Sequence, residues 1–196
     1  MQLTLATKNA GKVREIKKIL PEFDIQTMTE VGIELDIEEN GETFEENALI
    51  KARAIWKVCG GLVIADDSGL EIDYLGGQPG VHSSRFMGED TDYVIKNREL
   101  IHRLEKAKEG ERKARFVAVI ACILPDGREF TTRGTMEGEI AMEPSGTEGF
   151  GYDPILYLPD YGCTSAQISM EEKNKISHRG KALKKMRERL NREGVV

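Results

Sequence analysis

Short apolar segments alternate along this chain with longer amphipathic segments. Residues 62–65 are apolar throughout, whereas residues 3–6 and 23–28 mix apolar with polar positions, and each segment has the length of a β-strand. Helices are predicted over residues 12–20, about 43–59, about 91–108 and about 179–192, mainly from apolar positions spaced three and four residues apart. This alternation of strands and helices predicts an α/β fold.

The longest apolar run, residues 116–124, is apolar at every position. A strand that other structure covers on both faces has this pattern. Pro125, Asp126 and Gly127 follow it and predict a hairpin turn into a second strand over residues 128–136. Residues 143–154 are rich in glycine and proline and are predicted to form a functional loop.

The length and the segment pattern place the chain among single-domain proteins. Its 196 residues can bury a sizeable core and no linker-like segment divides them, so we predict one domain over residues 1–196. The longest apolar run is less than half of the roughly 20 residues that a membrane-spanning helix needs. The N-terminus leads directly into a strand pattern, without a charged leader. We therefore expect a soluble, cytoplasmic protein without a membrane partner.

Charge and cysteine content narrow the function classes. The net charge is -6, which argues against a broad surface for binding DNA or RNA. The 3 cysteines are an odd number at wide spacing, so neither a disulfide framework nor a zinc site is indicated. Basic residues that matter for function are therefore expected in local clusters.

An acidic break follows the apolar run at residues 62–65. Asp66, Asp67 and Ser68 separate two apolar segments, and bare carboxylates cannot lose their hydration without a cation or hydrogen-bond donors. A metal ion would supply that compensation. An ordinary turn at the end of a strand is the other interpretation, because Asp, Ser and Gly are common turn residues. The motif alone does not decide between them.

Glu39 is the candidate partner of this acidic pair. It precedes the second predicted helix and the pair follows the next strand, so the carboxylates can lie at one edge of a sheet. Mg²⁺ prefers oxygen ligands and usually takes one or two carboxylates together with waters and phosphate oxygens. Glu39, Asp66 and Asp67 are therefore the candidate metal ligands, whereas Glu38 and Glu42 fit a solvated charge run.

The turn after the first strand has the features of an anion site. It consists of Thr7, Lys8, Asn9, Ala10, Gly11 and Lys12, where a strand leads into a helix. Backbone N–H groups, the positive end of the helix dipole and a lysine in the first turn attract phosphate. The segment is not a Walker A loop, because Val13 stands where that motif has Ser or Thr. A plain strand-to-helix turn is the alternative.

Two further groups could contact a ligand. Phe150, between two glycines, offers a flat face on which a base could stack, an interaction worth about 1–3 kcal/mol. A glycine-aromatic turn that holds a β-bulge is the alternative. Arg179, which follows His178, could bind a phosphate or the O6 edge of a purine through two hydrogen bonds. Helix capping explains Ser177 without a function, and a lone histidine is more often structural.

Taken together, these motifs resemble one family. In order they are Thr7-x-Asn9-x-x-Lys12, Phe44-x-Glu46-Asn47-Ala48, Ala65-Asp66-Asp67-Ser68-Gly69-Leu70, Phe150-Gly151-Tyr152-Asp153-Pro154 and Ser177-His178-Arg179. They resemble the inosine/xanthosine triphosphate pyrophosphatase family, over the chain from Leu5 to the last helix. The resemblance implies a mixed α/β fold with a long twisted sheet flanked by helices, in two lobes with a nucleotide cleft between them.

The resemblance also implies an activity and a set of site residues. The family hydrolyses ITP, dITP and XTP to the monophosphate and pyrophosphate with Mg²⁺, and forms homodimers. Glu39 and Asp67 would bind the metal, with Asp67 also the general base, and Asp66 would be either a second ligand or the carboxylate that holds the turn. The substrate would be bound by Thr7, Lys8, Asn9, Ala10, Gly11, Lys12, Ser68, Phe150, Gly151, Tyr152, Asp153, Lys173, His178 and Arg179.

Other functions remain compatible with the sequence. A pyrophosphatase for other modified nucleotides would use the same groups, and a non-hydrolytic nucleotide-binding regulator would use the acidic motif only as a cap. A haloacid-dehalogenase-type phosphatase is disfavoured because Asp66 and Asp67 lack the Asp-x-Asp spacing of that mechanism. The hydrolase is favoured because attack of water on the α-phosphorus needs a base and neutralisation of the leaving pyrophosphate, which metal-binding carboxylates and lysines provide.

Overall fold

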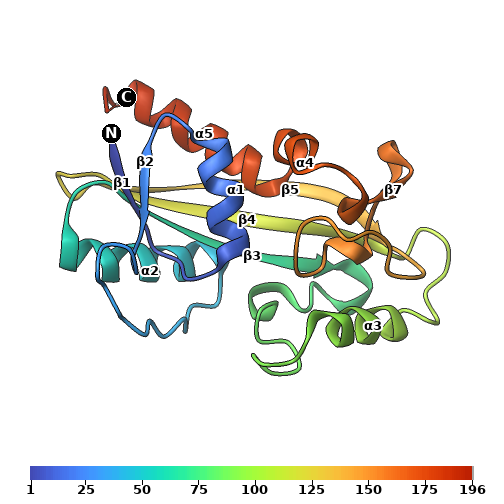
Figure 1. Ribbon diagram of the computed structural model, residues 1–196. Helices are drawn as coiled ribbons and strands as arrows, with labels where there is room; N and C mark the ends of the chain where they lie inside the picture. Colours follow the sequence, from blue (N-terminus) through green and yellow to red (C-terminus); the bar gives the residue numbers. More distant parts are fainter. Residues whose placement is uncertain (196) are drawn as a thin grey trace. The chain divides into compact units, whose positions relative to one another are not determined.

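The computed structural model describes residues 1–195 and contains one sheet accompanied by helices (Figure 1). The strands are β1 (Gln2–Leu5), β2 (Asp24–Thr27), β3 (Val63–Ile72), β4 (Lys113–Ile123), β5 (Glu129–Ile140), β6 (Leu156–Leu158) and β7 (Cys163–Thr164). The α-helices are α1 (Ala10–Ile19), α2 (Phe44–Cys59), α3 (Tyr93–Arg103), α4 (Met170–Ile176) and α5 (His178–Arg192). Among the described residues, no helix has the length and apolar character needed to cross a membrane.

The sheet combines parallel and antiparallel pairs. Its strand order is β2-β1-β3-β4-β5-β6-β7. β1 is parallel to both β2 and β3, whereas β6 is antiparallel to β5 and β7. The helix α1 connects β1 to β2, and α2 precedes β3, as expected because parallel neighbours require crossover connections. The mixed α/β fold predicted from the sequence is confirmed.

The chain forms two compact units, and the strands β3, β4 and β5 contribute residues to both. Unit 1 comprises Met1–Asp67, Ala118–Gly134 and the chain from His178 onward. Unit 2 comprises Ser68–Val117 and Thr135–Ser177. Each unit has a hydrophobic core of its own.

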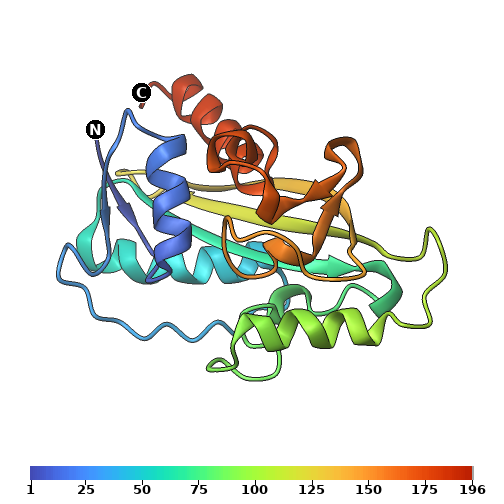
Figure 2. The same cartoon turned by 45° about the vertical axis from the view of Figure 1, so that its right-hand side comes forward.

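The helices of unit 1 cover both faces of its part of the sheet. Ile16 of α1 and Leu183 of α5 are fully buried in one core with the strand residues Leu5 and Ile64. The helix α2 lies on the opposite face, as both views show, and buries Ala52 there (Figures 1 and 2). Since successive side chains of a strand point to opposite faces, those of β3 meet α1 and α5 on one side and α2 on the other.

Capping groups fix the residues at which α1 and α2 begin. Asn9 Oδ1 accepts a hydrogen bond of 3.1 Å from the backbone N–H of Lys12. Thr43 and Glu46 form the capping box that their spacing predicts, with each side chain accepting from the backbone N–H of the other residue. Gly60 follows the last turn of α2 with a φ of 61°, a conformation that favours glycine. Each side-chain cap of this kind contributes about 1 kcal/mol.

The core of unit 2 includes α3 and the glycine-rich segment near residue 150. Leu70 of β3 and Leu100 of α3 are fully buried in it. Tyr152 packs into the same core, with its ring edge-on to that of Tyr93 at 5.1 Å between centroids. Its hydroxyl donates to the backbone carbonyl of Ser83 at 2.6 Å. The glycine-rich segment is thus anchored by a buried aromatic side chain.

The largest difference from the predicted elements is in β3. A turn is one of the two interpretations of residues 66–68, but the strand continues without interruption from Val63 to Ile72. It can do so because cations neutralise both carboxylates. The elements α4, β6 and β7 were not predicted either. The strands β6 and β7 have 3 and 2 residues, too few to show a period in the sequence.

Candidate active site

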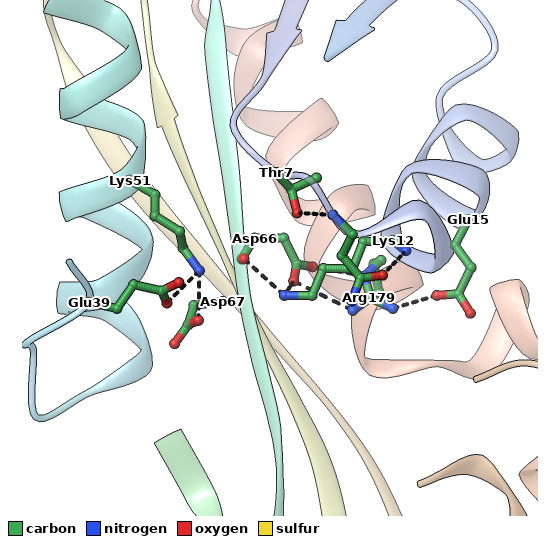
Figure 3. Close-up of polar contacts among 9 residues, drawn as sticks. Thr7, Lys12, Glu15, Glu39, Lys51, Asp66, Asp67 and Arg179 are labelled. Atoms are coloured by element: carbon green, nitrogen blue, oxygen red, sulfur yellow. Dashed lines mark hydrogen bonds and ion pairs between the residues drawn. The ribbon is translucent and has the colours of Figure 1, made fainter. Parts of the chain in front are cut away.

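The strand β3 directs its two adjacent carboxylates to opposite faces (Figure 3). Asp66 projects toward α1 and α5, and Asp67 projects toward α2. Both are buried, with exposed fractions of 0% and 7%. A buried carboxylate requires compensation, and each of the two has its own cations. We refer to Glu39, Lys51 and Asp67 as the Asp67 cluster, and to Lys12, Glu15, Asp66 and Arg179 as the Asp66 cluster.

Lys51 joins the two carboxylates of the Asp67 cluster. Its Nζ donates to Glu39 Oε2 and to Asp67 Oδ1, at 2.8 Å in each case. Lys51 lies on the buried face of α2, and Glu39 belongs to the segment that leads into this helix. The capping box sets the first residue of α2 and therefore helps to determine that Lys51 faces the strand.

The two carboxylates of this cluster differ in basicity. Burial raises the pKa of Asp67 above its ordinary value, although the ammonium group of Lys51 acts in the opposite direction. Burial also acts to raise the pKa of Glu39, but there Lys51, with smaller contributions from Asp67 and Lys12, outweighs it and holds the pKa of the carboxyl below its ordinary value. Asp67 is therefore the better proton acceptor of the pair. Two carboxyl groups whose pKa values are pushed apart in this way can take different roles in acid–base chemistry.

The second oxygen of Asp67 is suited to a further ligand. Asp67 Oδ2 is buried, and no N–H or O–H group within residues 1–195 donates to it. Such atoms are rare in proteins, and an ion or a water often accounts for them. Carboxylate oxygens are the donors that Mg²⁺ prefers. Among the described residues, no three Asp, Glu, His or Cys side chains are grouped so that they could hold a metal ion together, so the protein would supply two carboxylates, from Glu39 and Asp67.

Asp66 does not lie with these two carboxylates. Its Oδ1 is 2.6 Å from Lys12 Nζ, and its Oδ2 accepts a hydrogen bond of 2.8 Å from Arg179 Nε. Both oxygens are thus bound by cations on the other face of β3. This placement corrects the prediction that Asp66 could be a second metal ligand beside Glu39 and Asp67.

Asp66 is instead the centre of a buried charge network (Figure 3). Arg179 Nη1 donates to Glu15 Oε2 while its Nε donates to Asp66, and these three residues are at most 1% exposed. Burial acts against the charged form of Asp66, but Arg179 and Lys12 together outweigh it and hold the pKa of this carboxyl well below its ordinary range. Since a buried charge requires a partner, the network depends on each of its members.

Lys12 connects this network to the predicted phosphate loop. Its Nζ donates to the backbone carbonyl of Asp66 at 3.1 Å, and its side chain is 14% exposed. Within the loop, Thr7 Oγ1 accepts a hydrogen bond of 3.2 Å from the N–H of Asn9, the residue that caps α1. The first N–H groups of a helix have no partner within the helix, so α1 begins with donors next to Lys12. The exposed loop residues are Lys8, Asn9 and Ala10.

In unit 2, Asp153 binds two of the other candidate residues. Its Oδ2 accepts hydrogen bonds from the N–H of Phe150 at 2.8 Å and from Lys173 Nζ at 2.6 Å. Its Oδ1 accepts from the hydroxyl of Ser165. The ammonium group of Lys173 also lies over the ring of Phe150, 5.3 Å from the centroid. Asp153 is 1% exposed whereas Phe150 is partly exposed, so Asp153 orients its neighbours and Phe150 offers the stacking face.

Two glycines allow this tight arrangement. Gly149 has a φ of 75°, and a Cβ at this position would lie 2.1 Å from Asp153 Oδ2. Gly151 has a φ of 66°, and its carbonyl accepts a hydrogen bond of 3.1 Å from Asn97 Nδ2. The backbone is therefore held in place both before and after Phe150 in the chain.

The remaining candidates are Ser68 and His178. Ser68 follows Asp67 in β3 and is partly exposed. His178 is the first residue of α5 and is buried, with 5% exposed, next to Arg179 in the chain. Both stay predictions as substrate-binding residues.

Lys51 and Glu15 were not predicted as site residues from the sequence. Both occupy positions on the apolar stripe of an amphipathic helix. Lys51 lies between Ala48 and Ile55 on the buried face of α2, and Glu15 lies beside Ile16 on that of α1. A charged residue where helical periodicity assigns a core position is the signal that could have revealed them.

Comparison with known proteins points to one family. The profile of the Ham1 family matches residues 3–189. The dITP/XTP pyrophosphatase of Bacillus licheniformis is 48% identical over 187 residues, which cover 94% of this chain and 95% of that protein. The dITP/XTP pyrophosphatase of Caldanaerobacter subterraneus is 49% identical over 191 residues, with coverage of 96% and 95%. A solved Ham1 protein from Coxiella burnetii is similar with a TM-score of 0.88 and 41% identity, over 98% of this chain and 99% of that chain.

Proposed function

The chain belongs to the Ham1 family, and from this membership we propose that it hydrolyses deaminated purine nucleoside triphosphates to the monophosphate and pyrophosphate. The proposed substrates are ITP, dITP and XTP, and the bond that breaks is a phosphoric anhydride. The names of the relatives from Bacillus licheniformis and Caldanaerobacter subterraneus support this assignment. The observation that carries it is the Asp67 cluster, in which Lys51 holds two carboxylates of unequal basicity.

We propose Asp67 as the general base. A water oxygen bonds to the α-phosphorus as one of its protons passes to Asp67. The bond from the α-phosphorus to the bridging oxygen breaks, and pyrophosphate leaves with that oxygen. Lys51 holds Asp67 through Oδ1 and so orients the carboxylate for this role. A positioned general base contributes about 10²–10⁴-fold to a rate.

We propose Mg²⁺ as the cofactor, with Glu39 and Asp67 as its protein ligands. Bound there, a divalent cation neutralises phosphate oxygens and lowers the pKa of a coordinated water. Burial acts to lower the pKa of Lys51, but the charges of Asp67 and Glu39 outweigh it and raise this pKa. The ammonium group therefore stays charged and keeps the two carboxylates from repelling each other.

We propose that the loop from Thr7 to Lys12 binds substrate phosphates. The N–H groups at the start of α1 and the Lys12 ammonium group support this role. Ser68, Phe150, Gly151, Tyr152, Asp153, Lys173 and His178 are the further proposed substrate-binding residues. Among them, Phe150 has a partly exposed ring for stacking, whereas Asp153 and Tyr152 are buried and act by holding the segment in place. Arg179 was predicted with them, but its guanidinium group is buried and donates to Asp66 and Glu15, so its proposed role is within the Asp66 cluster.

We also infer a cytoplasmic homodimer. Nucleoside triphosphates, the proposed substrates, are precursors held in the cytoplasm. The motifs that resemble the inosine/xanthosine triphosphate pyrophosphatase family, whose members form homodimers, support the dimer. Light scattering on the eluting protein should give about twice the chain mass of 21.9 kDa.

A nucleotide panel tests the proposed activity. ITP, dITP, XTP, ATP and GTP are each incubated with the protein, with and without Mg²⁺, and assayed for pyrophosphate and orthophosphate. We expect pyrophosphate from the first three only when Mg²⁺ is present, and a preference over ATP of about 5- to 150-fold, as a pair of hydrogen bonds to a base edge provides. Release of orthophosphate, or no turnover, would contradict the proposal.

A further inference from the structure

Glu15 is a buried carboxylate to which the proposed mechanism assigns no task. It is 1% exposed, although it lies on a helix near the surface loop that precedes α1. Lys12 is three residues earlier on the same helix, and side chains at this spacing share one face. Burying a charge is costly unless it is paired. The partner of the Glu15 carboxylate therefore contributes to the stability of the fold, to the geometry of the site, or to both.

The contacts of Glu15 lead step by step to Lys12 (Figure 3). Glu15 Oε2 accepts from Arg179 Nη1, and Arg179 Nε donates to Asp66 Oδ2 at 2.8 Å. The other oxygen of Asp66 lies 2.6 Å from Lys12 Nζ. Each link is a hydrogen bond between opposite charges, which is the strongest kind in proteins. The position of the Lys12 ammonium group therefore depends on a chain of contacts that ends at Glu15.

Glu15 also balances the charges of the network. Asp66 faces two cations, Arg179 and Lys12. Without Glu15, Arg179 would have Asp66 as its only carboxylate partner in the network and would draw it away from Lys12. With Glu15 present, two acids face two bases, and Asp66 Oδ1 lies closer to Lys12 Nζ, at 2.6 Å, than to Arg179 Nη2, at 3.5 Å.

We propose that Glu15 is a positioning residue that holds the Lys12 ammonium group at the phosphate loop, through Arg179 and Asp66. This inference rests on the proposed function in one respect, namely that Lys12 binds substrate phosphates. Glu15 itself touches neither substrate nor the reacting atoms. Its effect is on the affinity for polyphosphate and not on the chemical step at Asp67, which lies on the other face of β3.

The test compares Glu15→Gln and Glu15→Asp with a matched surface variant, Glu30→Gln. Glu30 also pairs with a cation of α1, Lys17, at 3.3 Å, but its side chain is 52% exposed. Three quantities are measured for each folded variant: KM and kcat for ITP with Mg²⁺, and the Kd for tripolyphosphate without metal, by calorimetry. The tripolyphosphate Kd can be measured without any catalysis.

We expect Glu15→Gln to raise both KM and the tripolyphosphate Kd about tenfold, the effect of losing one charge-assisted hydrogen bond. Its kcat should stay close to that of the wild type. Glu15→Asp keeps the charge but is one methylene shorter, so it should give intermediate values. Glu30→Gln should leave all three quantities unchanged.

Unchanged KM and Kd in a folded Glu15→Gln protein would overturn the inference, and so would a loss confined to kcat or to the folded fraction. If Glu15→Gln does not fold, Glu15→Asp decides in the same way: raised KM and Kd support the inference, and wild-type values overturn it. Failure of the wild-type protein to hydrolyse ITP would refute the proposed function instead. The tripolyphosphate comparison would still test Glu15 in that case.

Discussion

At the scale of single residues, two neighbouring aspartates have opposite properties because their partners differ. Asp66 is bound by two cations and is held ionised, whereas Asp67 shares one cation with Glu39 and has a raised pKa. The type and spacing of the residues do not distinguish the two positions. The alternation of the strand does, because it places one carboxylate beside Arg179 and the other beside Lys51.

For Asp67→Asn we expect kcat for ITP to fall by about 10²–10⁴-fold, the contribution of a general base. The amide oxygen can still accept from Lys51, so the nucleotide should bind with little change in Kd. Steady-state kinetics and calorimetry measure the two quantities. Asp126→Asn is the control, because Asp126 is an exposed residue of unit 1. A near-normal kcat in Asp67→Asn would mean that another group accepts the proton.

Asp66 gives a prediction for stability against pH. Its pKa is lowered in the folded protein, so its contribution to stability is present above the unfolded-state value of about 3.9 and is lost as the pH falls toward the folded-state value. The free energy of unfolding of the wild type should therefore decrease as the pH is lowered below about 4–5. Asp66→Asn should be less stable at neutral pH by about 3–5 kcal/mol, the cost of breaking a buried pair, and should lose less on acidification. Urea unfolding across this pH range measures both, and an equal acid loss in variant and wild type would contradict the account.

At the scale of elements, the sequence predicted the longer helices and strands and missed what depends on distant partners. α1, α2 and α5 were predicted because their periodicity and caps are local. The continuity of β3 through Asp66 and Asp67 was not, because it requires Arg179, which lies 113 residues after Asp66 in the chain. When the distant cations are not known, two adjacent aspartates in the sequence look like the residues of a turn.

The glycine-rich segment of unit 2 gives a prediction with a matched control. Gly149 and Gly162 have similar φ values, 75° and 65°, but only Gly149 faces a group that a Cβ would strike, Asp153 Oδ2. Gly162→Ala should cost about 1–2 kcal/mol for the left-handed conformation alone. Gly149→Ala should cost more and should also raise KM for ITP, because Asp153 must move away from Phe150 and Lys173. Equal losses of unfolding free energy in urea, with an unchanged KM, would show that Asp153 does not organise this segment.

At the scale of the whole molecule, the motifs predicted the family and the fold class, and the contacts supplied the organisation of the site. The pairing of Glu39 with Asp67 agrees with the prediction that they lie together, whereas Asp66 belongs to a separate network. Lys51 and Glu15 were missed because charged residues on helices are normally solvated, although both stand where helical periodicity assigns a buried position. The division into two units also arises from contacts between distant segments, which no local pattern in the sequence reports.

The central claim is that Asp67 directs a water molecule to the α-phosphorus of a deaminated purine nucleoside triphosphate. The most direct test is hydrolysis of ITP with Mg²⁺ in water enriched in a heavy oxygen isotope, followed by mass spectrometry of both products. We predict that the label enters the phosphate of IMP and that the released pyrophosphate is unlabelled. Label in the pyrophosphate, or orthophosphate as the product, would contradict the account.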